Sequence, residues 1–231
     1  MKVLYADNAL LVLDKPAGLL SVPGRGEDKQ DCLSARVQAI YPDALIVHRL
    51  DMATSGLMLM ARGAVAQRSL SHAFASRDVT KRYGAIVSGQ ITPPADEWGV
   101  IDLPIIVDWP NRPRRIIDVQ TGKPSVTRWQ IANPDAGSVA AGATRSVGVA
   151  AIVSFDRSGP FTRVMLEPIT GRSHQLRVHL AAVGHSILGD PLYAPPQDQA
   201  RASRLLLHAC SLGLAHPVTG EWTQFTSDIP F

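Results

Sequence analysis

The chain has 231 residues, which makes it longer than one small domain and shorter than two full ones. Hydrophobic residues make up 45% and charged residues 19%, which excludes a wholly disordered chain and supplies enough apolar side chains for a large core. The formal net charge is +3, a weak indication of an anionic partner. We therefore expect one elaborated domain over residues 1–231.

The N-terminal segment predicts a β-hairpin and then a short helix. Apolar runs at residues 3–5 and 9–13 lie on either side of Asp7-Asn8, a pair that favours a tight turn. After a loop rich in glycine and proline, Asp31 is expected to cap a short helix. This segment therefore begins the fold with two paired strands.

The next segment alternates between strand and helix patterns. Val47 and the apolar run at 57–61 predict two strands with a polar segment between them. Apolar residues at helical spacing then predict a helix over residues 64–77. We expect this helix to cover one face of the sheet.

The rest of the chain indicates many short strands and few helices. A second helix is expected after Gly171, with Gly184 as its stop. Residues 132–149, rich in Ala, Gly, Ser and Val, predict a surface loop. The expected strands are residues 80–87, 99–106, 115–119, 126–131, 150–155 and 162–166. This pattern predicts an α+β fold with a mixed, mainly antiparallel sheet and flanking helices.

The sequence lacks the patterns of a membrane protein, of a secreted protein, and of metal and nucleotide sites. The most apolar stretches fall far short of the roughly 18 residues of a membrane helix, and Asp7 interrupts any N-terminal signal peptide, so we expect a cytoplasmic protein without a membrane span. Cys32 and Cys210 stand apart, which argues against disulfides and structural zinc. His174 and His179 lie about 140° apart on a helix and do not form a metal pair. No phosphate-binding or dinucleotide motif is present.

The polar segment at residues 48–56 needs a reason, because polar groups beside a core cost free energy unless they are paired. One interpretation is a turn in which Asp51 binds loop amides and Gly56 supplies an unusual backbone angle. The other is a reactive carboxylate, since an Asp beside an Arg stays ionised and suits a nucleophile or base. Glycoside hydrolysis normally needs a second carboxylate, for which Asp102 and Asp108 are candidates. The residues alone leave both interpretations open.

The string His-Arg-Leu-Asp-Met-Ala-Thr-Ser-Gly-Leu at residues 48–57 resembles the signature of the RluA-type RNA pseudouridine synthases. Further matching segments follow in the order which that family shows, at residues 15–19, 81–83, 102–104, 121–124, 170–179, 189–190 and 206–209. The resemblance covers nearly the whole chain. Two features resemble the RluA branch in particular. One is the segment at residues 108–113, and the other is an immediate start at the catalytic domain, without the small RNA-binding domain that many relatives carry. The Ala/Gly-rich stretch 132–149 departs from the pattern and resembles an expansion of a strand connection.

The resemblance implies a role for each of five residues. Asp51 would be the catalytic aspartate, Tyr83 would stack on the target uracil, and Arg177 would pair with Asp51. Arg49 would take the place of the flipped base, and Arg172 would contact the substrate. The resemblance also implies a central RNA-binding cleft, no cofactor, no metal and no obligate protein partner.

The implied activity is conversion of uridine to pseudouridine in structured RNA. In the RluA branch the targets are the first uridine of the anticodon loop in some tRNAs and a hairpin of large-subunit rRNA. Two alternatives remain: a non-catalytic RNA-binding module would not need Asp51, and an RNA N-glycosidase would release free uracil. Candidates for phosphate contacts, each alone more often a solvated surface charge, are Arg25, Arg112, Arg114, Arg115 and Lys123.

Overall fold

The computed structural model describes residues 2–94, 97–132, 144–145 and 152–231, which form two compact units. Of these residues, the first unit holds 2–81, 144–145 and 208–229, and the second holds 82–94, 97–132, 152–207 and 230–231. The expectation of one domain over residues 1–231 stays a prediction.

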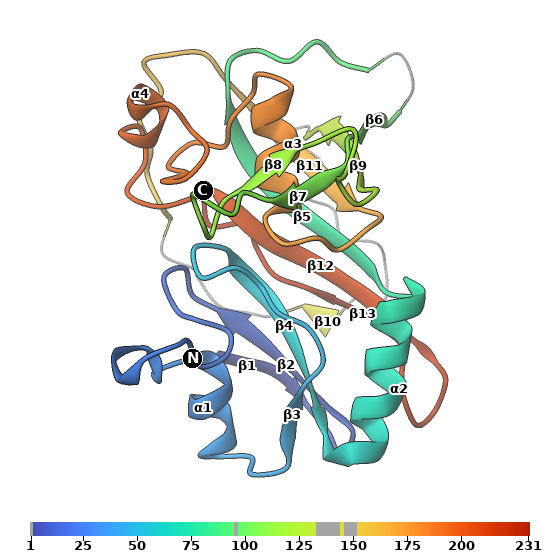
Figure 1. The fold of residues 1–231 in the computed structure, drawn as a ribbon. Helices are drawn as coiled ribbons and strands as arrows, with labels where there is room; N and C mark the ends of the chain where they lie inside the picture. Colours follow the sequence, from blue (N-terminus) through green and yellow to red (C-terminus); the bar gives the residue numbers. More distant parts are fainter. Residues whose placement is uncertain (1, 95–96, 133–143, 146–151) are drawn as a thin grey trace. The chain divides into compact units, whose positions relative to one another are not determined.

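The first unit is built on strands that pair in the order β1-β2-β4-β12-β13 (Figure 1). Their bounds are β1 Lys2–Ala6, β2 Leu10–Lys15, β4 Ser55–Arg62, β12 Leu207–Ala215 and β13 Trp222–Thr226. Short strands β3 (Ala44–Ile46) and β10 (Thr144–Arg145) pair with β4 and β13. The β4–β12 and β10–β13 pairs are parallel and the others are antiparallel. Strands β2 and β4 are continuous apolar runs and are buried almost throughout, so they form the core of this unit.

Three helical segments accompany these strands: η1 (Glu27–Lys29), α1 (Leu33–Gln38) and α2 (Gly63–Ser76). Helix α2 confirms the helix predicted over residues 64–77. Helix α1 is also confirmed, but its predicted cap was wrong. Cys32 is the N-cap residue, and its Sγ accepts a hydrogen bond from Ala35 N at 3.4 Å. Asp31 instead forms an ion pair with Arg36 at 2.6 Å.

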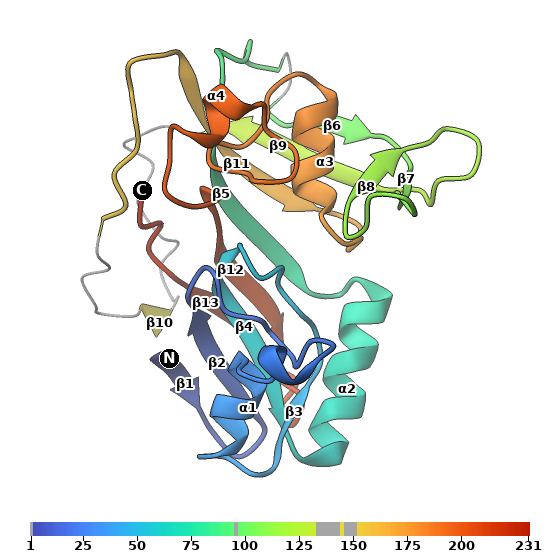
Figure 2. The same ribbon diagram turned by 60° about the vertical axis from the view of Figure 1, so that its left-hand side comes forward.

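The second unit contains antiparallel strands in the order β5-β11-β9-β6, with helix α3 beside them (Figure 2). The bounds are β5 Thr80–Ser88, β6 Gly99–Asp102, β9 Val126–Ile131, β11 Phe161–Pro168, α3 Gln175–Ala182 and α4 Pro196–Gln199. A separate two-stranded sheet joins β7 (Ile105–Val107) and β8 (Arg115–Ile117). Helix α3 packs against β8, β9 and β11.

The predicted α+β class and mainly antiparallel pairing are confirmed. Val47, predicted to lie in a strand, follows the end of β3, and two further predicted strands were wrong. Residues 99–106 form two strands in different sheets, because the chain breaks at Leu103-Pro104 and proline has no N–H to donate to a ladder. Of the strand predicted at 150–155, residues 152–154 have no strand structure, and Phe155 makes one isolated bridge to Ala202. The loop predicted at 132–149 lies outside the described residues, except for Ala132 and strand β10.

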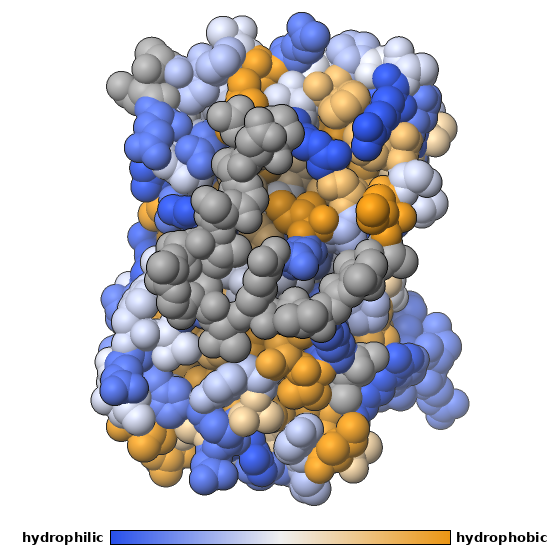
Figure 3. All heavy atoms as spheres, turned by 180° about the vertical axis from the view of Figure 1, so that it is seen from behind, coloured by the Kyte–Doolittle hydropathy of each residue, from blue (hydrophilic) through white to orange (hydrophobic). Residues whose placement is uncertain are grey.

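Exposed hydrophobic residues are spread over both units, and on the face drawn in Figure 3 hydrophobic patches are separated by hydrophilic residues. Val65 and Val218 are exposed in the first unit, and Trp109 and Val119 in the second. Within the described part of the chain, no helix is long and apolar enough to cross a membrane. Single exposed apolar side chains are ordinary on protein surfaces.

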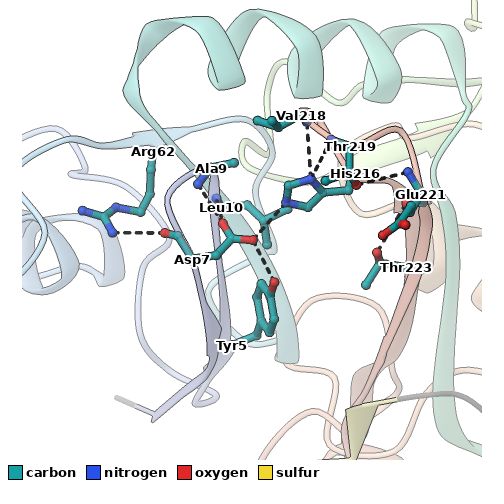
Figure 4. A network of polar contacts seen from close by, with 10 residues as sticks. All are labelled: Tyr5, Asp7, Ala9, Leu10, Arg62, His216, Val218, Thr219, Glu221 and Thr223. Carbon is teal, nitrogen blue, oxygen red and sulfur yellow. Dashed lines mark hydrogen bonds and ion pairs between the residues drawn. The ribbon is translucent and has the colours of Figure 1, made fainter.

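Asp7 joins two turns of the first unit through a network of polar contacts (Figure 4). Its carboxylate accepts hydrogen bonds from Ala9 N at 2.7 Å and Leu10 N at 2.8 Å, which fixes the predicted β1–β2 turn. Tyr5 Oη donates to the same carboxylate at 2.7 Å, and His216 Nε2, from the β12–β13 turn, lies 2.9 Å from it. Burial alone would raise the pKa of Asp7, but these hydrogen bonds outweigh burial and lower the pKa from 3.8 to about 2.

This network predicts a loss of stability in acid. Because the folded pKa of Asp7 lies below the unfolded one, its carboxylate stabilises the fold above pH 4, and that contribution is lost as the pH falls toward 2. Because the carboxylate is partly open to solvent, which screens its interactions, we expect a contribution of roughly 1 kcal/mol. Asp7→Asn is therefore expected to lower the free energy of unfolding at pH 7 and to flatten its dependence on pH between 4 and 2. Urea unfolding at several pH values measures this, with exposed Asp28→Asn as the control; an unchanged slope would contradict it.

Candidate active site

Asp51 lies in the loop between β3 and β4, where the backbone is held on both sides of it. Leu50 is tied to the hydroxyl of Ser21: its N–H donates to Ser21 Oγ at 3.2 Å, and its carbonyl accepts from the same hydroxyl at 2.7 Å. On the other side, Thr54 N donates to Asp51 O at 3.1 Å and closes a turn. Asp51 itself is half-buried. The segment therefore forms a turn at Asp51, as one interpretation expected. The role of the Asp51 carboxylate stays a prediction.

Lys15 holds the residue that follows Asp51. Its side chain is fully buried, and Nζ donates to the carbonyls of Leu19 at 2.8 Å, Pro16 at 3.0 Å and Met52 at 3.0 Å. Gly18 N donates to the same Met52 carbonyl at 2.9 Å. Burying an ammonium group is costly unless each N–H finds an acceptor, and here three carbonyls supply them. The N-terminal loop is thereby fastened to the Asp51 loop.

A buried chain of polar side chains holds the start of β4. Ser55 Oγ lies 2.9 Å from His208 Nδ1, and His208 Nε2 lies 3.1 Å from Ser227 Oγ. Ser227 Oγ in turn donates to Asp14 Oδ2 at 3.5 Å. Ser55 is only 5% exposed, so the geometry suits a structural link between β4, β12 and β2 rather than a serine nucleophile. Sequence reasoning missed His208, whose role depends on a contact across 153 residues.

Gly56 permits β4 and β12 to approach closely just after this loop. Its φ is +108°, and an added Cβ would lie 2.6 Å from the backbone nitrogen of Ala209. The predicted unusual backbone angle at Gly56 is therefore confirmed. Gly56→Ala is expected to destabilise the protein by about 2 kcal/mol or more and to displace the Asp51 loop. Chemical denaturation with Gly18→Ala as a comparison tests this, because an added Cβ at Gly18 meets nothing within 4 Å; equal losses would contradict the role of close approach.

His48, at the start of the loop, is a packing residue. Its Nε2 accepts a hydrogen bond from Leu59 N at 2.8 Å, and its ring stacks on Phe74 with centroids 4.3 Å apart. Burial and the charge of Lys81 lower the pKa of His48 to about 3. The ring is therefore neutral at pH 7, as an acceptor nitrogen requires. Arg49, the next residue, is exposed.

The other predicted site residues belong to the second unit. Tyr83 lies on β5 opposite Leu166 of β11 and is half-buried. Arg172 is exposed in the loop before α3. Gln175 supports this loop: its Oε1 accepts from Arg172 N at 3.0 Å and from Thr170 Oγ1 at 2.7 Å. Sequence reasoning assigned no function to Gln175.

Arg177 lies on α3 and forms a buried ion pair with Asp190. Its Nε donates to Oδ2 at 2.8 Å and its Nη2 donates to Oδ1 at 2.6 Å, with side chains that are 3% and 0% exposed. Asp190 Oδ1 also accepts from Leu192 N at 2.9 Å. This bidentate contact fixes the guanidinium plane. The predicted pairing of Arg177 with Asp51 concerns residues of different units and stays a prediction.

The predicted histidines and cysteines are packed into the two units. His179 is buried and lies 2.9 Å from both Thr127 Oγ1 and the carbonyl of Leu103. Burial lowers its pKa, against opposing effects of Leu103 and Asp102. Cys32 and Cys210 are both buried free thiols. In the parts of the chain that the structure describes, no three His, Cys, Asp or Glu side chains gather as metal ligands would.

Comparisons with known proteins bear on what this arrangement does. A family model described as RNA pseudouridylate synthase matches residues 9–182. Proteins named dual-specificity RNA pseudouridine synthase RluA are similar over nearly the whole chain. That of Yersinia pestis is 45% identical over 231 residues and covers all of both chains, and that of Escherichia coli K12 is 44% identical over 229 residues, 99% of this chain and 93% of the relative. The solved structure of human RNA pseudouridylate synthase domain containing 1 is 26% identical with a TM-score of 0.73, over 99% of this chain and 83% of the other.

Proposed function

This chain belongs to the RluA-type RNA pseudouridine synthases, and we propose that Asp51 is the carboxylate through which it turns uridine into pseudouridine. The observation that supports this most is the fixed backbone around Asp51, with Leu50 tied to Ser21 and Met52 tied to Lys15. A catalytic group must be held close to its productive position, and rigid support supplies that.

The reaction rearranges one nucleotide without a net change in atoms. The bond from uracil N1 to ribose C1′ breaks, and C5 of the turned base bonds to the same carbon. A proton leaves C5 and a proton is taken up at N1. In the proposal, ionised Asp51 abstracts a ribose proton or adds to the sugar or the ring, as a base or nucleophile does.

Three arginines and one tyrosine have further roles in the proposed reaction. The target nucleotide must leave its stack, which costs a few kcal/mol. Arg49, exposed and planar, fills the vacated space, and Tyr83 stacks on the extruded uracil, a contact of about 1–3 kcal/mol. Arg177, fixed by Asp190, supplies a positive charge to the catalytic carboxylate, and Arg172 binds RNA.

The proposed substrates are structured RNAs of two kinds. The similar bacterial proteins carry dual specificity in their names. We infer that this chain likewise modifies the first uridine of the anticodon loop in some tRNAs and a hairpin of large-subunit rRNA. The anticodon-loop target lies in an RNA loop, where extrusion of a base costs less than from a duplex.

Tritium release tests the activity and its alternatives together. The purified protein, with EDTA and without a cofactor, is incubated with tRNA and rRNA transcripts labelled with tritium at C5 of uridine. Tritium in water without free uracil is the expected result. Free uracil would instead indicate an RNA N-glycosidase, and RNA binding without either product would indicate a non-catalytic module.

A further inference from the structure

The loop that joins β7 and β8 carries an exposed tryptophan beside an arginine. Trp109 is 63% exposed, and Arg112 Cζ lies 4.2 Å from the centroid of its ring. Figure 2 shows this loop extending from the two strands, away from α3. Arg112 covers part of the ring, and the exposure of the residue leaves the indole accessible to another planar group.

The loop is ordered by its own hydrogen bonds. Asn111 Nδ2 donates to both oxygens of Asp108 at 3.1 and 3.0 Å, and Asp108 N donates to Arg114 O at 3.1 Å. Arg114 N donates to Asn111 O at 3.0 Å. A pre-ordered loop loses little conformational entropy when it binds a partner.

Tyr193 anchors the base of the loop to the rest of the second unit. Its Oη accepts from Arg115 N at 2.8 Å and lies 2.7 Å from His174 Nδ1, at the start of α3. Arg114 Cζ lies over its ring at 5.6 Å and Arg177 Cζ at 5.0 Å. Tyr193 therefore contacts both the 108–115 loop, through Arg114 and Arg115, and Arg177 of helix α3.

The charge of the loop favours an anionic partner. Residues 108–115 contain three arginines and one aspartate, a net charge of +2, and the aspartate already accepts hydrogen bonds from Asn111. An indole stacks on any base, and arginine presents planar donors to phosphates. An acidic protein would be bound by the arginines alone and would not require an exposed tryptophan, whereas RNA offers bases as well as phosphates.

We propose that the 108–115 loop is a second RNA-contact surface, in which Trp109 stacks on an unpaired base outside the target uridine and Arg112, Arg114 and Arg115 contact phosphates. The inference rests on the proposed function, because it supposes an RNA with other unpaired bases near the target. The loop binds the RNA and takes no part in the bond changes at the uridine.

RNA affinity of Trp109 variants tests the stacking. With a fluorescein-labelled anticodon stem-loop RNA, Trp109→Ala is expected to raise Kd roughly 5- to 150-fold, as loss of one stacked base does, and Trp109→Phe to retain most of the affinity. In steady state the alanine variant raises KM and leaves kcat unchanged. Trp222→Ala, which removes the 58% exposed tryptophan of the first unit, is the matched control and leaves Kd unchanged. Wild-type affinity in Trp109→Ala would overturn the stacking.

Salt dependence separates stacking from charge. Arg112→Ala is expected to reduce the slope of log K against log salt by about 0.7–0.9, the value for one lost phosphate contact, whereas Trp109→Ala leaves the slope unchanged. Unchanged slope and affinity in Arg112→Ala would overturn the phosphate contact.

The test remains distinct from that of the proposed function. If the wild-type protein released no tritium but Trp109→Ala still weakened binding, the RNA surface would stand and the proposed activity would fail. If tritium were released and both variants bound RNA like the wild type, the activity would stand and the surface would fail.

Discussion

Asp51→Asn is expected to abolish pseudouridine formation, with turnover reduced by about 10⁴-fold or more, while RNA affinity stays within a few-fold. Asparagine keeps the size of the side chain but cannot act as a base or nucleophile. The backbone contacts of Leu50 and Met52 do not involve the Asp51 carboxylate, so the loop is expected to keep its conformation. Single-turnover tritium release measures the rate, and fluorescence anisotropy with the same RNA measures the affinity.

The control for this substitution is Glu27→Gln, which removes an exposed carboxylate of the same unit. It should release tritium at the wild-type rate. If Asp51→Asn did the same, Asp51 would be a turn residue and no more. If the variant lost RNA binding to the same degree as activity, Asp51 would serve in binding.

Lys15→Met is expected to have the next largest effect. Methionine fills a similar volume, but it leaves the carbonyls of Pro16, Leu19 and Met52 without the donor that Nζ supplies. The Met52 carbonyl keeps the hydrogen bond from Gly18 N, so two carbonyls, those of Pro16 and Leu19, are left without a donor. We expect the free energy of unfolding to fall by about 3 kcal/mol, at roughly 1–3 kcal/mol for each group left unsatisfied. Because the Met52 carbonyl adjoins Asp51, kcat should fall at least tenfold at a temperature where the variant is still folded.

A surface lysine provides the comparison for Lys15. Lys29→Met, in the exposed segment η1, removes the same charge from the same unit. It should change neither stability nor kcat. Wild-type kcat in folded Lys15→Met would show that the Asp51 loop keeps its position without the buried ammonium.

Local signals predicted much of the fold. Strand β9 has the predicted bounds, Val126–Ile131, and the Asp7 turn and helix α2 follow from turn chemistry and helical periodicity. The failures have physical causes. Leu103-Pro104 ends a strand that hydropathy alone would continue. Strands β12 and β13 were not predicted. Strand β12 pairs with β4, which is distant in the sequence, and β13 pairs with β12.

The candidate site was less accessible to sequence reasoning. Asp51 stands out in the sequence because it belongs to a polar segment that lies between two apolar strands. Lys15 does not stand out, since a lysine is rarely buried and its three acceptors include Met52, 37 residues away. The Arg177–Asp190 pair likewise depends on tertiary contact. The family resemblance identified the segments that contain these residues. It did not predict which side chains contact one another, because those contacts form only in the folded chain.

The most direct test of the central claim is a crystal structure of the Asp51→Asn variant bound to an anticodon stem-loop RNA. The account predicts that the target uridine is extruded and that the side chain at position 51 lies within hydrogen-bond reach of its ribose or uracil. A target uridine that remains stacked in the RNA, or that lies against other residues with position 51 out of reach, would contradict it.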